Sequence, residues 1–283
     1  MGDLGALRDR LVELDRVVVA FSGGADSAFL AAVAHRTLGP ERASALTAVS
    51  PSLAPEEEGE CRALAAEWGL RWVPVITDEL ADPAYAANDG QRCFHCKSAL
   101  MDVAVPVAEA EGATVVLGVN VDDLGEHRPG QQAAAERGAV FPLVDAGFTK
   151  ADVRAASHAL GLRTWDKPAA ACLASRLPYG TPVTLGALAE VAAAESALRR
   201  LGFRQLRVRH YGDLARLEIP VEELALAVER REEVVAAVSG AGYRYVTLDL
   251  EGFRSGNLNY HPGLEPLPPW SKDNRRFGQD IRP

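Results

Sequence analysis

The sequence of 283 residues is poor in lysine and cysteine, and it lacks an apolar run long enough to cross a membrane. Its N-terminus does not carry the pattern of a secretory signal peptide, so we expect a cytoplasmic protein with no membrane partner. Thiols stay reduced in that compartment. The four cysteines are therefore expected to be metal ligands, nucleophiles or core residues rather than disulfides.

The balance of charge argues against one broad class of partner. The formal net charge is −9, which gives a nucleic acid no overall attraction, so we expect no nucleic-acid partner. Apolar residues make up 48% of the chain and charged residues 24%, as in ordinary globular proteins. A globular chain of this length forms one large domain or two ordinary ones.

Strand-like and helix-like segments alternate over residues 1–165, which predicts an α/β fold with a doubly wound parallel sheet. Residues 166–182 contain prolines and a cysteine, and we expect a cysteine-bearing active-site loop or linker there. Residues 183–260 predict a smaller α+β domain for substrate binding or oligomerisation, and residues 261–283 predict a mobile tail. The expected strands are 17–21, 45–49, 72–76, 114–119, 140–143, 205–209, 215–219 and 243–250, and the expected helices are 1–16, 28–38, 55–69, 94–111, 150–160, 185–201 and 221–238.

The β-branched strand at 17–21 runs directly into a glycine-rich loop, SGGADS at 22–27. Adjacent glycines let a backbone approach an anion closely, and the N-terminus of a following helix offers free N–H groups to it. The loop lacks the Gly-Lys-Ser/Thr ending of a Walker A motif. It resembles instead the PP-loop of N-type ATP pyrophosphatases, which split ATP into AMP and pyrophosphate. A tight strand-to-helix turn is the alternative reading of this loop.

Three of the cysteines lie in segments that favour reactive thiols. Cys93 and Cys96 form a C-x-x-C pair at the start of an expected helix, and Arg92 and Lys97 beside them favour thiolates. Cys172 lies in the irregular segment between the expected domains, where ligands often bind. The C-x-x-C pair alone is compatible with a redox pair, half a zinc site, part of an iron–sulfur cluster or buried structural thiols.

The number of these thiols narrows the choice of metal. A structural zinc site needs four ligands, and His95, inside the C-x-x-C spacing, is expected to point elsewhere. A four-iron cluster held by three cysteines leaves one iron free for an exogenous ligand such as hydrosulfide. The remaining cysteine, Cys61, lies in the middle of an expected helix and is interpreted as a core residue.

Two further polar groups have the composition of phosphate or metal sites. Asp122 and Asp123 follow an expected strand on the loop's edge of the sheet, which suits Mg²⁺ held with nucleotide phosphates, although polar turns have the same composition. Arg207 and Arg209 alternate along an expected strand and so share one face, with Glu218 on the next strand. Paired guanidinium groups match phosphate or carboxylate, although a solvated strand face is equally compatible.

Four segments together resemble the LarE sulfur transferases, the ATP-dependent sulfur-insertion enzymes of nickel-pincer nucleotide biosynthesis. They are the loop at 22–27, the segment 92–97, the segment 171–180 and the strand around Arg207 and Arg209. Enzymes of this family adenylate a carboxylate of pyridinium-3,5-biscarboxylic acid mononucleotide and convert it to a thiocarboxylate. The resemblance therefore implies a small-molecule nucleotide substrate, ATP and Mg²⁺ as cofactors, and sulfide or another sulfur donor as a partner. It also implies a homo-oligomer, commonly a hexamer.

The family has two branches, which differ in the source of sulfur. In one, the cysteine that matches Cys172 gives up its own sulfur and becomes dehydroalanine. In the other, three cysteines hold a [4Fe–4S] cluster, and this sequence matches that branch at Cys93, Cys96 and Cys172. The sequence leaves open whether Cys172 is a cluster ligand or a sulfur donor.

The resemblance also assigns roles to individual residues. One departure is Gly125-Glu126-His127-Arg128, where an Asp-Tyr pair is expected before the arginine, so the role of Glu126 stays open. The expected catalytic residues are Cys172, Asp26 and Ser27; those for ATP and Mg²⁺ are Ser22, Gly23, Gly24, Asp26, Ser27 and Asp123; those for substrate or phosphate are Ser175, Arg176, Arg207, Arg209 and Glu218.

Three other functions are compatible with a PP-loop. A PP-loop tRNA thiolase can also carry an iron–sulfur cluster, but it needs a basic RNA-binding face. A PP-loop amide-forming ligase needs none of the cysteines. A nucleotide-binding or zinc-stabilised interaction protein without catalysis would release no pyrophosphate.

Overall fold

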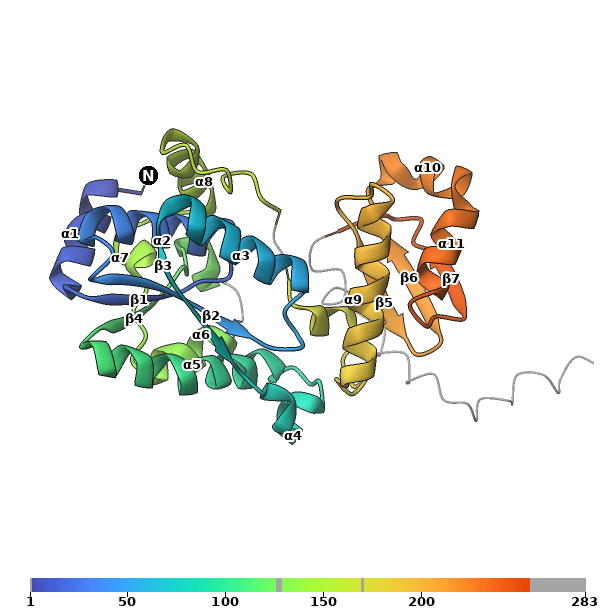
Figure 1. Cartoon of the computed structure of the whole chain (residues 1–283), viewed down its shortest axis with the longest axis horizontal. Coiled ribbons are helices and arrows are strands. Elements are labelled where there is room, and N and C mark those ends of the chain that lie inside the picture. Colours follow the sequence, from blue (N-terminus) through green and yellow to red (C-terminus); the bar gives the residue numbers. More distant parts are fainter. Residues whose placement is uncertain (1, 126–128, 169–170, 255–283) are drawn as a thin grey trace, which may run out of the picture. The chain divides into compact units, whose positions relative to one another are not determined.

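A computed structural model describes residues 2–125, 129–168 and 171–254, and its chain divides into two compact units (Figure 1). The first unit comprises Met1–Ala86 and Gly90–Cys172, and the second comprises Ala87–Asp89 and Leu173–Pro283. The segment expected to be a linker, 166–182, is thus shared between the units. The tail at 261–283 and Glu126 lie outside the described residues. Among the residues described, no helix has the length and apolarity needed to cross a membrane.

The first unit is built on a parallel sheet of four strands in the order β3-β2-β1-β4, which confirms the predicted α/β class. In the centre of the sheet, Val19 pairs with Ala45 on one side and with Val116 on the other. Every valine of β1 is buried, as expected for a strand covered on both faces. The strands are β1 (Val17–Ala20), β2 (Ala43–Val49), β3 (Arg71–Ile76) and β4 (Thr114–Leu117).

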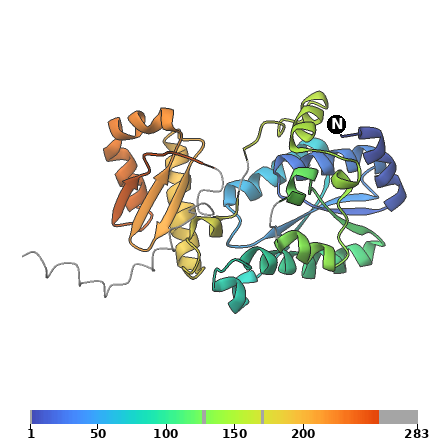
Figure 2. The same cartoon turned by 180° about the vertical axis from the view of Figure 1, so that it is seen from behind.

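Helices cover both faces of this sheet (Figures 1 and 2). Val17 and Val19 contribute to the core under α1, α2, α3, α7 and α8, whereas Val18 contributes to the core under α5 and α6. This division follows from the two-residue period of a strand. The helices are α1 (Leu4–Leu14), α2 (Ala25–Leu38), α3 (Pro55–Trp68), α4 (Pro83–Ala86), α5 (Arg92–Glu111), α6 (Pro129–Glu136), α7 (Pro142–Asp145) and α8 (Lys150–Ala159), with short 3₁₀ turns at η1 (Glu79–Ala81) and η2 (Val121–Gly125).

The second unit has a mixed sheet of three strands in the order β5-β6-β7, as an α+β domain requires. Strand β6 runs antiparallel to β5 and parallel to β7. Its core joins Leu198 of α9, Leu217 of β6 and Val238 of α11. The elements are η3 (Leu173–Arg176), α9 (Leu185–Arg200), β5 (Arg207–Tyr211), β6 (Leu214–Glu218), η4 (Val221–Glu223), α10 (Leu224–Glu229), α11 (Arg231–Ser239) and β7 (Tyr245–Leu248).

Two predicted elements differ from the structure. The strand expected at 140–143 is reduced to an isolated bridge between Val140 and Val116, because Pro142 has no N–H for a ladder and begins α7 instead. The single helix expected at 221–238 is divided at Arg230, whose backbone leaves the helical region at φ −96° and ψ 24°. The Arg230 guanidinium donates a hydrogen bond of 2.6 Å to the carbonyl of Leu201, which holds this break in place.

Candidate active site

The glycine-rich loop lies at the carboxyl end of β1 and leads into α2. Gly23 has a φ of +69°, and a Cβ atom there would lie 3.0 Å from the Sγ of Cys61, so both conformation and space require glycine. Gly24 is the N-cap of α2, and this helix end has no side-chain cap in the described structure. Its first-turn N–H groups are therefore available to an anion.

The helix expected to begin at residue 28 begins at Ala25, so Asp26 and Ser27 lie in its first turn. The Ser27 Oγ accepts a hydrogen bond of 3.2 Å from the Ser22 N–H and lies 3.1 Å from the Ser22 Oγ. It also donates a bond of 3.2 Å to the carbonyl of Gly24. In this arrangement Ser27 closes the loop on itself and sets its shape.

Asp26 belongs to a polar group formed by the ends of β1 and β4. Asn120, which is fully buried, donates a side-chain hydrogen bond of 3.1 Å to Asp26, and its N–H donates one of 3.2 Å to Asp123. Burial raises the pKa of Asp26; the bond from Asn120 opposes this shift, and the charge of Asp123 adds to it. Two neighbouring carboxylates beside a phosphate cradle are a suitable ligand set for Mg²⁺.

Close packing brings the two strand ends together. A Cβ atom on Gly118 would lie 2.8 Å from the Ser27 nitrogen, which only glycine avoids. Sequence reasoning assigned no role to Gly118 or Asn120, because neither residue belongs to a recognisable motif. The sequence signal that could have identified Gly118 and Asn120 is their position directly after the end of β4.

Two lysines that sequence reasoning also left unassigned lie at this edge. The Lys150 Nζ is 3.1 Å from an oxygen of Asp123. The Lys167 Nζ is 2.7 Å from an oxygen of Glu57 and 3.2 Å from the carbonyl oxygen of Gly23. Lysine is scarce in this chain, and that scarcity is the sequence signal that could have drawn attention to these two residues.

The three thiols expected to hold a cluster all belong to the first unit. Cys93 is exposed, whereas Cys96 and Cys172 are half-buried. Burial raises the pKa of Cys96 to about 12; the charge of Lys97 opposes this shift, and the charges of Cys172 and Cys93 add to it. Within the described ranges, however, no three His, Cys, Asp or Glu side chains are grouped to hold a metal ion.

Polar side chains surround these thiols. The Tyr85 hydroxyl is buried and lies 2.6 Å from the Ser52 Oγ. Burial raises the pKa of Tyr85, and the nearby Cys172 adds to the effect. His95 is engaged by Asp82, with 3.0 Å between its Nδ1 and a carboxylate oxygen. Among the described residues, the donor set is therefore three thiols beside a histidine that is already paired, which suits iron–sulfur better than tetrahedral zinc.

In the second unit, three of the predicted substrate-binding side chains, Arg176, Arg209 and Glu218, form ion pairs with residues of the same unit. Arg176 makes a two-pronged contact with Glu195, at 2.8 and 3.1 Å. Arg209 is 2.8 Å from Glu218, and Arg216 reaches the other oxygen of that carboxylate at 3.0 Å. Glu195 and Glu218 are fully buried. These charges are neutralised inside the unit.

Ser175 and Arg207 complete this group. Ser175 accepts a bond of 2.8 Å from Arg209 on its carbonyl and one of 3.0 Å from Arg176 on its hydroxyl. Arg207 is 6% exposed and lies over the ring of Phe253, with 4.8 Å between its Cζ and the ring centroid. No described residue accepts a hydrogen bond from the Arg207 guanidinium. Burial, Arg209 and Arg176 lower the pKa of Arg207 to about 10, and a bound anion would counter this effect.

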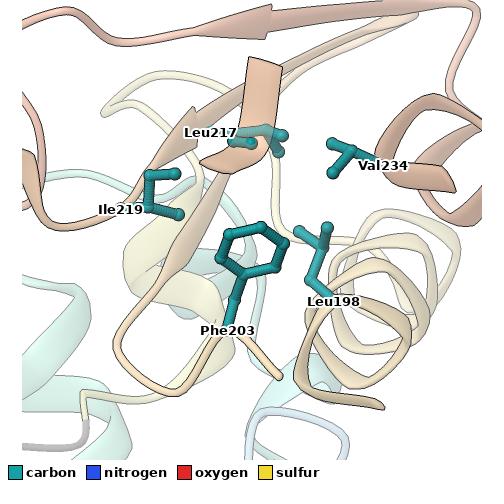
Figure 3. Close-up of a pocket in the computed structure, with 6 residues that line it drawn as sticks. Leu198, Phe203, Leu217, Ile219 and Val234 are labelled. Atoms are coloured by element: carbon teal, nitrogen blue, oxygen red, sulfur yellow. The ribbon is translucent and has the colours of Figure 1, made fainter. Parts of the chain in front are cut away.

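The second unit also contains an apolar cavity (Figure 3). The side chains of Phe203, Leu217 and Val234 converge there without a polar group among the lining residues. A ligand would find nothing to orient it. This space belongs to the core of the unit and is not a second active site. Its lining residues are Leu198, Phe203, Leu217, Ile219, Ala227 and Val234.

A parallel α/β sheet with a glycine-rich loop, an open helix N-terminus and paired carboxylates defines the class of PP-loop ATP-using proteins. The NAD synthase family model matches residues 7–92, which contain this loop. A protein of uncharacterised function from Synechocystis is 48% identical over 256 residues, covering 89% of this chain and 95% of the relative. An uncharacterised protein from Methanocaldococcus jannaschii is 25% identical over 241 residues, covering 85% and 91%.

One relative has a named activity. The pyridinium-3,5-bisthiocarboxylic acid mononucleotide synthase of Lactiplantibacillus plantarum is 38% identical over 250 residues, covering 88% of this chain and 91% of the relative. A match of this length extends over both units. The chain therefore belongs to the family of that synthase, the LarE sulfur transferases.

Proposed function

We propose that the protein is an ATP-dependent sulfur transferase of nickel-pincer cofactor biosynthesis. It adenylates a carboxylate of pyridinium-3,5-biscarboxylic acid mononucleotide and replaces an oxygen of that carboxylate with sulfur, releasing AMP and pyrophosphate. The observation that carries this proposal is the PP-loop with its open helix N-terminus in a chain that belongs to this family. The enzyme works in the cytoplasm, where its thiols stay reduced.

The first step activates the carboxylate, whose oxygen is otherwise a poor leaving group. A carboxylate oxygen attacks the α-phosphorus of ATP, the bond to the β-phosphate breaks, and pyrophosphate leaves. The loop and the first turn of α2 donate N–H groups to the phosphate oxygens, while Ser27 keeps the loop closed. Asp26 and Asp123 are the residues that would hold Mg²⁺, which offsets the charge of the departing pyrophosphate.

The second step replaces oxygen with sulfur. A sulfur nucleophile attacks the carbonyl carbon of the acyl-adenylate, and AMP leaves with the former carboxylate oxygen. We assign Cys93, Cys96 and Cys172 to a [4Fe–4S] cluster; their common place in the first unit and their all-thiol donor set support this assignment. When bound, such a cluster supplies a site for sulfide, so that turnover consumes no cysteine. Sulfide or another donor then renews the sulfur.

Arg207 is the residue we assign to the phosphate of the mononucleotide substrate. It is a buried guanidinium with no acceptor among the described residues, and two neighbouring cations repel it. A phosphate would complete its hydrogen bonds and relieve that repulsion. The mutual contacts of four neighbouring residues would hold Arg207 in place: Ser175, Arg176, Arg209 and Glu218. We also propose that the working enzyme is a homo-oligomer.

The sulfur step is tested with Cys172→Ser. We expect this variant to release pyrophosphate from ATP in the presence of substrate and to form no thiocarboxylate. Pyrophosphate release and the mass of the product are measured in the same reaction, so the first readout shows that the variant is folded. Formation of thiocarboxylate by Cys172→Ser would contradict the proposed role of this cysteine.

The metal assignment has its own test. Protein purified without oxygen should contain iron and acid-labile sulfide in equal amounts, and Cys93→Ser should lose both while keeping its circular dichroism. A colourless protein with stoichiometric zinc and no reconstitutable cluster would overturn the assignment. In that case the mass of Cys172 after one turnover shows whether the residue becomes dehydroalanine.

A further inference from the structure

The Lys167 side chain lies on the phosphate loop, although the two are far apart in the sequence. Its Nζ is 3.2 Å from the carbonyl oxygen of Gly23 and 2.7 Å from an oxygen of Glu57 in the first turn of α3. The side chains of Lys167 and Glu57 are 17% and 26% exposed, so this ion pair is partly shielded from water. All three residues belong to the first unit.

The backbone around Lys167 is held by its own contacts. The Lys167 N–H donates to the carbonyl of Thr164 at 3.1 Å, and Thr164 is almost completely buried. Arg154 of α8 donates to the carbonyls of Trp165 and Lys167, at 3.3 and 3.2 Å. The segment therefore presents its lysine to the loop from a fixed position.

The loop needs such a cation. It lacks the lysine that ends a Walker A motif, yet the triphosphate must bind there and pyrophosphate must leave with added charge. A lysine ammonium has three N–H donors, and the contacts with Glu57 and Gly23 account for two of them. No described residue accepts a hydrogen bond from the third donor, which can therefore reach a phosphate oxygen bound by the loop without displacement of the lysine.

We propose that Lys167 is a phosphate-binding residue of this PP-loop, supplied from outside the motif. Its ammonium donates to the phosphates of ATP and stabilises the departing pyrophosphate, and Glu57 is the counter-charge of the ammonium before ATP binds. This proposal rests on the use of ATP in the proposed function. It does not depend on the sulfur step or on the identity of the carboxylate.

A competing explanation is that the Lys167–Glu57 pair only ties the segment after α8 to α3. The chain provides a matched control for that role, since Arg163 ties the same segment to Glu60 and Glu67 of α3 at 2.5 and 2.7 Å. The Arg163 side chain is 44% exposed, and its ion-pair partners in the described structure, Glu60 and Glu67, lie outside the loop. Arg163→Met therefore removes a tether without removing a cation from the nucleotide.

The test measures binding of ATP and AMP by calorimetry in Lys167→Met, Lys167→Arg, Glu57→Gln and Arg163→Met. Loss of one charged hydrogen bond predicts that Lys167→Met weakens ATP binding by about 10-fold or more, with a smaller effect on AMP. Lys167→Arg should recover part of the affinity. Glu57→Gln should bind ATP at least as tightly as the wild type, because it removes a competing negative charge, and Arg163→Met should bind ATP unchanged.

Two outcomes would overturn the proposal. If Lys167 is only a tether, Glu57→Gln breaks the same tether and weakens ATP binding as much as Lys167→Met. If Lys167 does not contact the distal phosphates, ATP and AMP lose affinity equally. Neither outcome affects the proposed sulfur transfer. Conversely, wild-type protein that binds ATP but forms no thiocarboxylate would contradict the proposed function without contradicting the proposed role of Lys167.

Discussion

In the first unit, the ends of β1 and β4 bring the backbone donors of α2 and the carboxylates of Asp26 and Asp123 together at the edge of the sheet. In the second unit, Arg209 and Glu218 lie on the faces of paired strands and neutralise each other. The difference shows that residue type alone does not define a binding site. Polar groups at the carboxyl ends of parallel strands are placed to bind a ligand, whereas charged groups between packed elements form ion pairs with one another.

The largest expected effect comes from Asp26→Ala in the first unit. Loss of a carboxylate that would hold Mg²⁺ beside the phosphates should lower the rate of ATP consumption by about 100-fold or more. Pyrophosphate release measures the rate, and thermal unfolding shows whether the fold is retained. Ordinary pyrophosphate release by this variant would show that the loop at 22–27 is only a turn.

The next effect concerns stability and should be confined to the second unit. Glu218→Gln leaves the buried Arg209 without its counter-charge and leaves Arg216 with only its longer contact to Asp249, which should cost about 3–5 kcal/mol in the free energy of unfolding. Urea denaturation measures the change. The control is Glu233→Gln, which breaks an exposed pair with Arg230 and should change the free energy of unfolding far less. Equal losses in the two variants would mean that the buried pairs contribute no more than surface pairs.

Arg207→Met tests, within the second unit, the difference between Arg207, which has no described acceptor, and the paired Arg209. Because the pKa of Arg207 is lowered to about 10, its charge is unfavourable in the folded state at every pH below that value. The variant should therefore be as stable as the wild type at neutral pH, or more stable, yet bind the mononucleotide about 10-fold more weakly. Arg209→Met, by contrast, should lose stability. An equal loss of stability in both variants would make Arg207 a packing residue.

Much of the first unit was predictable because its signals are local. The β-branched run of β1 and the glycines of the loop indicate their own conformations, and alternation of strands and helices indicates a parallel sheet. The strand at 140–143 was wrong because Pro142 outweighed the apolar pattern. The break at Arg230 could not be predicted, since it depends on the distant carbonyl of Leu201.

The site was predictable to the extent that it follows motifs. The loop and the cysteines belong to short patterns with a chemical reason for each residue. Asn120 and Lys167 belong to none, and their importance arises from partners 94 and 144 residues away in the sequence. Arg209 was expected to face a ligand from its alternation with Arg207, but alternation indicates a shared face and not what covers that face.

The sequence by itself determined the α/β class, the phosphate loop and the family, because these depend on local conformation and on motifs of neighbouring residues. Only the tertiary structure decided which charges are already neutralised and which are available, because that depends on contacts between distant segments. Arg176 and Arg209 are paired, Arg207 has no described acceptor, and Lys167 reaches a loop that contains no lysine of its own.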